Sequence, residues 1–291
     1  MKRVSVIGSL LVLGVLLPVV GGVEAGGAIE QETLERAQRR LATERVAQNS
    51  QGEEAQRLYQ EGLQLFQQGT AESLQAAIEK FEAAIPLFQS VGDQLNEGVT
   101  KHWAGFAYDK LGFKSEALEH YEQALAIWQE LGQEARGEDL ETVQNWQAIT
   151  LSNIGLVYDS LGEKEQALEF YNQALPLSQA VGDRATEATT LNNIGLVYDS
   201  LGEKEQALDY YNQALPLTRA VGDRATEATT LNNIGLVYDS LGEKEQALDF
   251  YNQALPLRRA VGDRAGEATT LNNIGGVYSD LGEKEKALEF Y

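Results

Sequence analysis

The chain has 291 residues, a formal net charge of −21 and no cysteine. Such an acidic surface repels a phosphate backbone, which argues against nucleic acid as a partner. The absence of cysteine excludes disulfide bonds, thiolate nucleophiles and thiolate metal sites.

Residues 1–25 have the composition of a secretory leader. Lys2 and Arg3 are basic, residues 4–20 form an almost unbroken apolar run, and Val23 and Ala25 place small residues before a cleavage point. We therefore predict a signal peptide that ends at Ala25. The alternative is an uncleaved anchor, because roughly 17 apolar residues approach the span of a bilayer core. In either case we expect the repeats outside the cytoplasm, in the periplasm or the extracellular space.

Residues 26–54 are polar and are predicted to form a partly helical linker. The apolar residues of this stretch are spaced too irregularly for a coiled coil; they are Ile29, Leu34, Leu41 and Val46.

From residue 55 onward the chain repeats itself with a period of 40. Residues 185–224 and 225–264 agree at 38 of 40 positions, 145–184 is a close relative, and two diverged copies come earlier. A partial copy, 265–291, stops at Tyr291, inside its second helix. This self-similarity predicts an array of six units over 55–291, the last one truncated. Each unit has one glycine at an equivalent position, here called the anchor glycine: Gly62, Gly105, Gly155, Gly195, Gly235 and Gly275.

Each unit has the pattern of two helices joined by a tight turn. Within 184–201, apolar residues recur at spacings of three and four, and a second such stripe begins at Ala207. Gly202 and Gly222 are placed to end the two helices, and Asp223 is placed to cap the next one. No β-alternation occurs, so the predicted fold class is all-α.

Small residues predict where the paired helices come close. Gly195 and Ala207 lie twelve positions apart across the turn, and we expect the two backbones to approach each other there. Tyr198 and Tyr211 are expected to fill the volume between the helices as core residues.

Two irregular features leave alternatives open. Pro86, Pro176, Pro216 and Pro256 occupy one register of the second helices, where either a bend or a stop and restart is expected. Ten extra residues between Gly132 and Trp146 predict either an elongated helix or a protruding loop, with a packed Trp146 preferred to an exposed one.

The spacing of these residues resembles the tetratricopeptide repeat signature. It reads Leu191, Ile194-Gly195, Tyr198, Ala207, Tyr211 and Ala214, and it recurs in the units anchored on Gly155 and Gly235. The 40-residue spacing resembles the subtype of kinesin light chains and of many multi-repeat bacterial proteins. The usual proline that ends the second helix is missing. The resemblance implies tandem helix–turn–helix repeats stacked as a right-handed α-solenoid.

In that family the first helices line a concave groove that binds proteins or peptides. The expected groove stripe is Thr189, Asn192, Leu196 and Asp199, with counterparts Thr229, Asn232, Leu236 and Asp239 and, less completely, Thr269 and Asn272. Asparagine amides both donate and accept, which suits a peptide backbone; the alternative is that they only keep an exposed face hydrated. The adjacent Asn193, Asn233 and Asn273 are expected to bond between helices. Acidic residues at the groove edge, among them Asp159, favour a neutral or basic partner segment.

No arrangement of residues indicates catalysis. His102 and His120 lack a cysteine or a serine–carboxylate partner, and no glycine-rich phosphate loop or paired-histidine metal spacing occurs. We therefore expect no enzyme activity, no cofactor and no metal, and interpret the chain as a protein- or peptide-binding scaffold. Two alternatives remain open: a regulatory or sensor arm of a larger protein with a downstream effector such as a CHAT protease domain, and a simple spacer. A solenoid needs a polar cap, so the stop at Tyr291 is expected to mark a fragment or a continuing array.

Overall fold

Twelve α-helices and no strand make up the residues that the computed structural model describes, 26–291. The side chains of residues 26–39, 41, 42 and 45 lie outside this description, as does the predicted signal peptide, residues 1–25. The helices are α1 (Gly26–Phe66), α2 (Ala71–Val91), α3 (Gln94–Lys110), α4 (Lys114–Glu134), α5 (Glu138–Leu161), α6 (Lys164–Val181), α7 (Arg184–Ser200), α8 (Lys204–Val221), α9 (Arg224–Ser240), α10 (Lys244–Val261), α11 (Arg264–Asp280) and α12 (Lys284–Phe290).

The chain divides into two units, residues 1–49 and residues 50–291. The stretch 26–54, predicted from the sequence to be a partly helical linker, is helical throughout and forms the first part of α1. The later part of α1 carries the anchor Gly62 and pairs with α2, since Ala55 and Leu58 share a buried cluster with Ala84 and Phe88.

Local sequence signals set the ends of the helices in each regular unit. The Asp183 side chain accepts hydrogen bonds from the backbone N–H groups of Ala185 and Thr186 at the start of α7, and Asp223 does the same for α9. Gly202 and Gly222 follow the two helices with φ of 82° and 73°, a left-handed conformation that favours glycine. The predicted boundaries of the helix pair are therefore confirmed.

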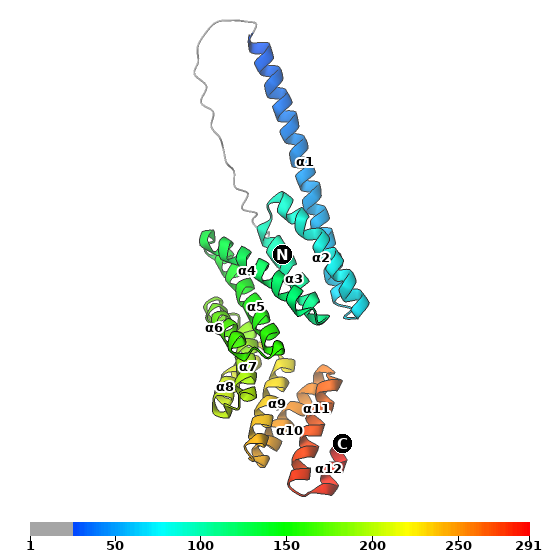
Figure 1. The fold of residues 1–291 in the computed structure, drawn as a ribbon, viewed down its shortest axis with the longest axis vertical. Helices are drawn as coiled ribbons and strands as arrows, with labels where there is room; N and C mark the ends of the chain where they lie inside the picture. Colours follow the sequence, from blue (N-terminus) through cyan, green and yellow to red (C-terminus); the bar gives the residue numbers. More distant parts are fainter. Residues whose placement is uncertain (1–25) are drawn as a thin grey trace. The chain divides into compact units, whose positions relative to one another are not determined.

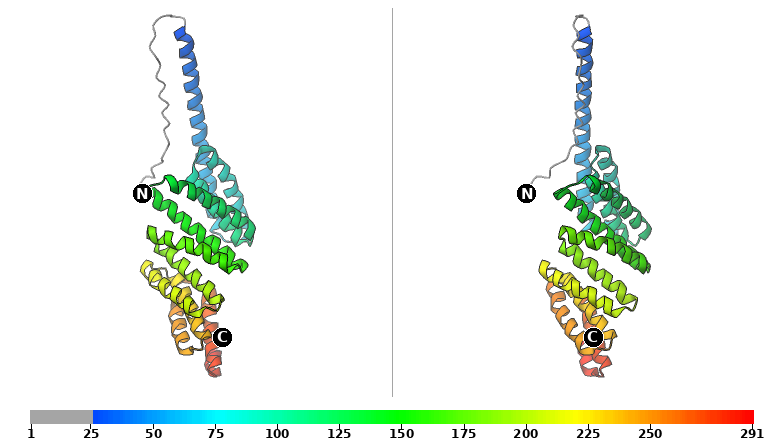
Figure 2. Two further views of the ribbon diagram at one scale, coloured as in Figure 1. Left: turned by 60° about the vertical axis from the view of Figure 1, so that its left-hand side comes forward. Right: turned by 90° about the vertical axis from the view of Figure 1, so that its left-hand side faces the viewer.

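Helix pairs follow one another as an α-solenoid within residues 50–291. Each helix from α2 to α12 packs against its neighbours in sequence, and the first helices of successive pairs also touch, α3 on α5, α5 on α7, α7 on α9 and α9 on α11. Figure 1 shows this order by colour, and the views in Figure 2 show the same succession of pairs from α3 to α12.

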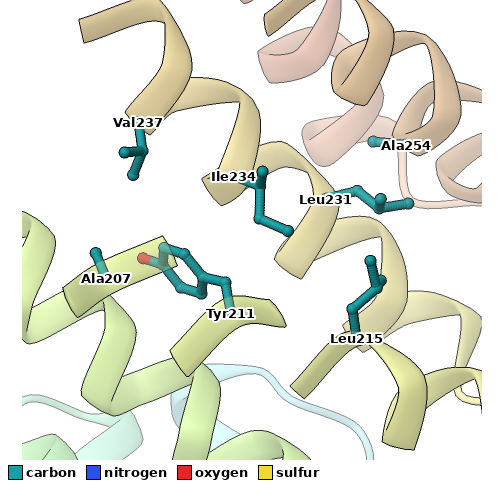
Figure 3. Packing of buried hydrophobic residues seen from close by; sticks show 7 residues of the cluster. All are labelled: Ala207, Tyr211, Leu215, Leu231, Ile234, Val237 and Ala254. Carbon is teal, nitrogen blue, oxygen red and sulfur yellow. The ribbon is translucent and has the colours of Figure 1, made fainter. Parts of the chain in front are cut away.

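Buried side chains join each pair to the next. Between α8 and α9, Tyr211 and Leu215 meet Leu231, Ile234 and Val237, with Ala207 and Ala254 completing the cluster (Figure 3). Six of these seven residues are at most 1% exposed, and Leu215 is 9% exposed. Equivalent clusters recur around Tyr171 and Tyr251, because the same apolar stripe repeats every 40 residues. The core is thus a series of equivalent contacts rather than one central cluster.

The anchor glycines make room for an aromatic ring. An ideal Cβ on Gly195 would lie 2.7 Å from Cε1 of Tyr211, and one on Gly235 would lie 2.5 Å from the same atom of Tyr251. The predicted close approach of the two backbones, at the glycine and the alanine twelve residues later, is seen in the second unit, where a Cβ on Gly105 would also lie 3.1 Å from the Ala117 carbonyl oxygen. At Gly195 the three nearest atoms belong to the Tyr211 ring, one turn farther along the second helix. Ala207 is nevertheless fully buried, in the cluster that it shares with the next unit.

The second helices continue without a break through their prolines. Pro86, Pro176, Pro216 and Pro256 lie inside α2, α6, α8 and α10, so the alternative of a stop and restart is wrong. All four prolines are exposed, as is Asn212, four residues before Pro216. Water can therefore satisfy the carbonyl group that loses its intrahelical N–H donor at each proline.

The ten extra residues lengthen two helices instead of forming a protruding loop. α4 has 21 residues against 18 in α6, and α5 has 24 against 17 in α7. Trp146 lies just after the added first turns of α5 and stacks on Trp128 of α4, with ring centroids 6.0 Å apart. The packed position preferred for this tryptophan is confirmed.

We expect Gly195→Ala to destabilise the array by about 1–3 kcal/mol, because the new methyl group would overlap the Tyr211 ring, which is fully buried and has no space to move into. Thermal unfolding followed by circular dichroism would measure this loss.

Gly276→Ala is the matched control for that substitution. Gly276 lies one residue after an anchor glycine in α11, and a Cβ there would meet nothing within 4 Å. Alanine should stabilise this helix by up to about 1 kcal/mol. Equal melting temperatures for the two variants would contradict the role assigned to the anchor glycines.

Candidate functional site

The predicted groove stripe divides into residues that face solvent and residues that face the next unit. Leu196 and Leu236 are each 39% exposed; Thr189, Thr269 and Asn272 are also exposed, and Thr229, Asp199 and Asp239 are half-buried. Asn192 and Asn232 are only 7% and 5% exposed. The ten residues therefore do not form one open surface.

Asn192 and Asn232 connect successive first helices. The Asn192 Oδ1 atom accepts from Asn233 Nδ2 at 3.4 Å and lies 3.2 Å from Thr230 Oγ1. Asn232 has the same relation to the next unit, with Asn273 Nδ2 at 3.1 Å and Thr270 Oγ1 at 3.3 Å. The interpretation of these asparagine oxygens as free acceptors for a peptide is therefore wrong, because the neighbouring unit occupies them. The expectation that Asn233 and Asn273 bond between helices is confirmed.

These contacts belong to a series that we call the polar ladder. Each step of the ladder is one contact between two first helices. It joins the residue three positions before one anchor glycine to the threonine five positions before the next anchor glycine. The four steps are His102–Thr150 at 2.9 Å, Ser152–Thr190 at 3.3 Å, Asn192–Thr230 at 3.2 Å and Asn232–Thr270 at 3.3 Å. All four threonines are fully buried. The ladder ties the first helices together along their buried edge.

His102 belongs to the ladder and shows no sign of a catalytic role. Burial lowers its pKa to about 3, so its imidazole is neutral. Its Nδ1 atom meets Thr150 Oγ1, which also accepts from the Trp128 indole N–H at 3.2 Å. His120 instead contacts Glu82 at 2.9 Å on the surface of α2 and α4. Among the side chains that the structure describes, no group of three or more histidine or acidic residues could hold a metal ion.

The aspartates of the predicted groove edge are paired with lysines. Asp159, Asp199 and Asp239 lie 2.6, 2.6 and 2.7 Å from Lys164, Lys204 and Lys244. Each pair joins the end of a first helix to the start of the second helix in the same unit. Partly exposed pairs of this kind add little stability, but they neutralise the edge. The sequence predicts a neutral or basic partner segment, and the pairing removes the charge that favoured a basic one.

A row of exposed leucines remains as the open part of the stripe. Leu156, Leu196 and Leu236, here called the leucine row, are 36–39% exposed and each follows an anchor glycine. Their helices α5, α7 and α9 touch in order, so equivalent positions on them lie side by side. Leu156 was missing from the predicted stripe, because its unit departs from the asparagine pattern. The position of Leu156 directly after the anchor glycine Gly155 would have identified it from the sequence.

Known proteins share both the repeat and the fold. A tetratricopeptide repeat model matches residues 146–220, 186–260 and 226–291, and thereby covers the second half of the chain without a gap. A second model of the tetratricopeptide repeat matches residues 104–131. A search of curated proteins finds no match.

Solved structures resemble the chain over most of its length. BtubC (BKLC) from P. vanneervenii is 25% identical, with a TM-score of 0.54 over 84% of this chain and 88% of its own. Aspartyl phosphate phosphatase F from Bacillus subtilis is 15% identical, with a TM-score of 0.66 over 85% and 70%. A Rap protein complexed with Competence and Sporulation Factor is 16% identical, with a TM-score of 0.56 over 82% and 73%. At such low identity the last two likenesses establish the fold alone.

Loss of a ladder contact should weaken the attachment between units. We expect Asn232→Ala to lower the free energy of unfolding by about 1–2 kcal/mol, because the Asn273 amide loses its acceptor and Thr270 loses a buried neighbour. Asn272→Ala, at the exposed equivalent position in α11, should change it by less than about 0.5 kcal/mol. Urea unfolding of both variants compares the two effects, and equal midpoints would contradict the ladder.

Proposed function

Because the chain belongs to the tetratricopeptide repeat family, we propose that it is a non-enzymatic scaffold that binds a protein or peptide along its first helices. The leucine row is the observation that carries this proposal. Single exposed leucines are common on protein surfaces. The same exposure at one position of three adjacent helices, however, repeats an apolar contact point along the array, as a site for an extended partner would.

Polar groups beside the leucine row are largely engaged within the chain. The hydroxyl groups of Thr189 and Thr229 donate to backbone carbonyls four residues earlier, at 3.0 Å. The Asn192 and Asn232 oxygens belong to the polar ladder, although their Nδ2 groups make no hydrogen bond within the described part of the chain and can donate to a partner. We therefore propose a neutral, apolar partner segment along the regular units, held mainly by contacts with leucine.

The other functions considered from the sequence have less support. A spacer needs no exposed apolar row, and nothing in residues 26–291 favours a regulatory arm over a free-standing scaffold. The Rap protein that shares this fold is complexed with Competence and Sporulation Factor, which is compatible with a binding role for an array of helix pairs. The proposal itself depends on the leucine row.

We also propose that the protein is exported, on the basis of the basic, apolar and small-residue pattern of residues 1–25. The mature chain should begin at Gly26, which mass spectrometry of material from the periplasm or the medium would show. Ala25→Arg should block cleavage, because signal peptidase requires a small residue there. Recovery of the uncut chain from the cytoplasm alone would contradict export.

Replacement of the leucine row should weaken partner binding without unfolding the array. Glutamine has nearly the helix propensity of leucine, so Leu156→Gln, Leu196→Gln and Leu236→Gln together remove apolar surface with little strain. If a partner covers the exposed two-fifths of each leucine, each side chain contributes roughly 0.5–1 kcal/mol. The triple variant should then bind about tenfold more weakly or worse, measured by isothermal titration with a peptide selected on the parent chain.

Leucines elsewhere on the same helices provide the control. Leu161, Leu201 and Leu241 are 42–48% exposed and lie at the carboxyl ends of α5, α7 and α9. Their replacement by glutamine should leave binding unchanged. A larger loss in this control than in the leucine-row variant would move the binding surface to the helix ends.

A further inference from the structure

The first two units differ from the regular ones at the positions that flank the leucine row. Phe66 stands four residues after its anchor glycine, where the unit anchored on Gly155 has Asp159. Trp103 stands two before its anchor glycine, where the regular units have asparagine, and Phe106 stands at the leucine-row position. Aromatic side chains therefore replace polar and aliphatic ones at this end of the array.

These three rings contact one another across the end of α1 and the middle of α3. The ring centroids of Phe66 and Trp103 lie 5.2 Å apart, those of Phe66 and Phe106 5.2 Å, and those of Trp103 and Phe106 5.9 Å. We call this group the aromatic cluster. Phe66 and Trp103 pack against the fully buried Ala77, Phe81 and Ala104. All three rings nevertheless remain partly exposed to solvent.

A lysine borders the aromatic cluster. The Lys110 Nζ atom lies 4.9 Å from the centroid of the Phe106 ring, and it forms no ion pair with any carboxylate whose side chain the structure describes. The nearby Lys114 is paired with Asp109 at 2.6 Å. In the regular units the position of Lys110 is serine, whose hydroxyl donates to its own helix, as in Ser200 to the Val197 carbonyl at 2.7 Å. Lys110 thus offers a positive charge on a chain whose net charge is −21.

We propose that the aromatic cluster and Lys110 form an anchor subsite, which takes an aromatic or large aliphatic side chain of the partner together with a neighbouring carboxylate. This proposal deepens the proposed function and rests on it. The rings supply apolar contact area, and Lys110, held over Phe106, pairs with the carboxylate beside the anchored side chain. Because Lys164, Lys204 and Lys244 of the other units are already paired with aspartates, an acidic partner residue binds best at Lys110. This preference fixes the direction in which the segment lies.

The repeats provide substitutions that remove the subsite with little disturbance. Phe106→Leu and Lys110→Ser each install the residue that the regular units carry at the same position. Lys110→Glu reverses the charge at an exposed site. Circular dichroism and melting temperature of each variant establish that the array is still folded.

To test the subsite, random dodecapeptides displayed on phage are selected for binding to the parent chain. The selected peptides should share an aromatic or large aliphatic residue with aspartate or glutamate next to it or a few residues away. Titration with the best synthetic peptide should show about two- to fivefold weaker binding for Lys110→Ser and about two- to tenfold weaker binding for Phe106→Leu. Selection on Lys110→Glu should enrich lysine or arginine in place of the acid, and higher salt should weaken binding to the parent more than to Lys110→Ser.

Each contrary result has a distinct meaning. Peptides that lose affinity in the leucine-row variant but bind Phe106→Leu and Lys110→Ser like the parent would overturn the anchor subsite and leave the groove intact. Selected peptides without an acidic residue, in equal numbers from the parent and from Lys110→Glu, would also overturn it. Failure to select any peptide on the parent chain would overturn both the subsite and the proposed function.

Discussion

The array depends on the contact between a glycine on the first helix of each unit and an aromatic ring on the second. A Cβ at Gly195 would lie within 2.7 Å of the Tyr211 ring, and the same relation recurs at every anchor glycine, with Phe81 in place of tyrosine in the first unit. Because the glycine has no side chain, the ring lies directly against the helix backbone, and it is buried in every unit but the last, where Tyr291 is 67% exposed. The Tyr211 ring also packs in one cluster with Ile234 and Val237 of the next unit (Figure 3), so the contact within a pair also shapes the surface that the following pair covers.

Stacking divides each first helix into a buried edge and an open edge. The buried edge carries apolar residues such as Ile194 together with the polar ladder, whose hydrogen bonds satisfy side chains that would be costly to bury unpaired. The open edge carries the leucine row and the aspartates that pair with lysines. The surface available to a partner therefore consists of the residues that neither pack against the next unit nor form hydrogen bonds with it. It is more apolar and less charged than the composition of the chain indicates.

The first two units differ from the regular units on their exposed edge. The regular units, which are nearly identical over 185–264, present the same apolar position again and again, which suits binding to an extended partner without strong selectivity. The first two units have exchanged these residues for the aromatic cluster, Lys110 and the ladder histidine His102. His102 contacts Thr150 in the same way as Asn192 contacts Thr230. The stacking geometry thus survives the exchange while the chemistry of the exposed edge changes.

The sequence by itself determined the all-α fold, the 40-residue unit and the ends of its helices, because the apolar stripes, the capping aspartates and the turn glycines act within a few residues of each other. It also identified the residues of the first helices that lie outside the apolar stripe. Only the tertiary structure decided which of them face a neighbour: the burial of Asn192 depends on the rotation between two stacked pairs, which places residue 192 next to residue 230. The same holds for the contact of Phe66 with Trp103, which belong to different units. Periodicity specifies the face of a helix, whereas the partner of that face depends on how whole units pack.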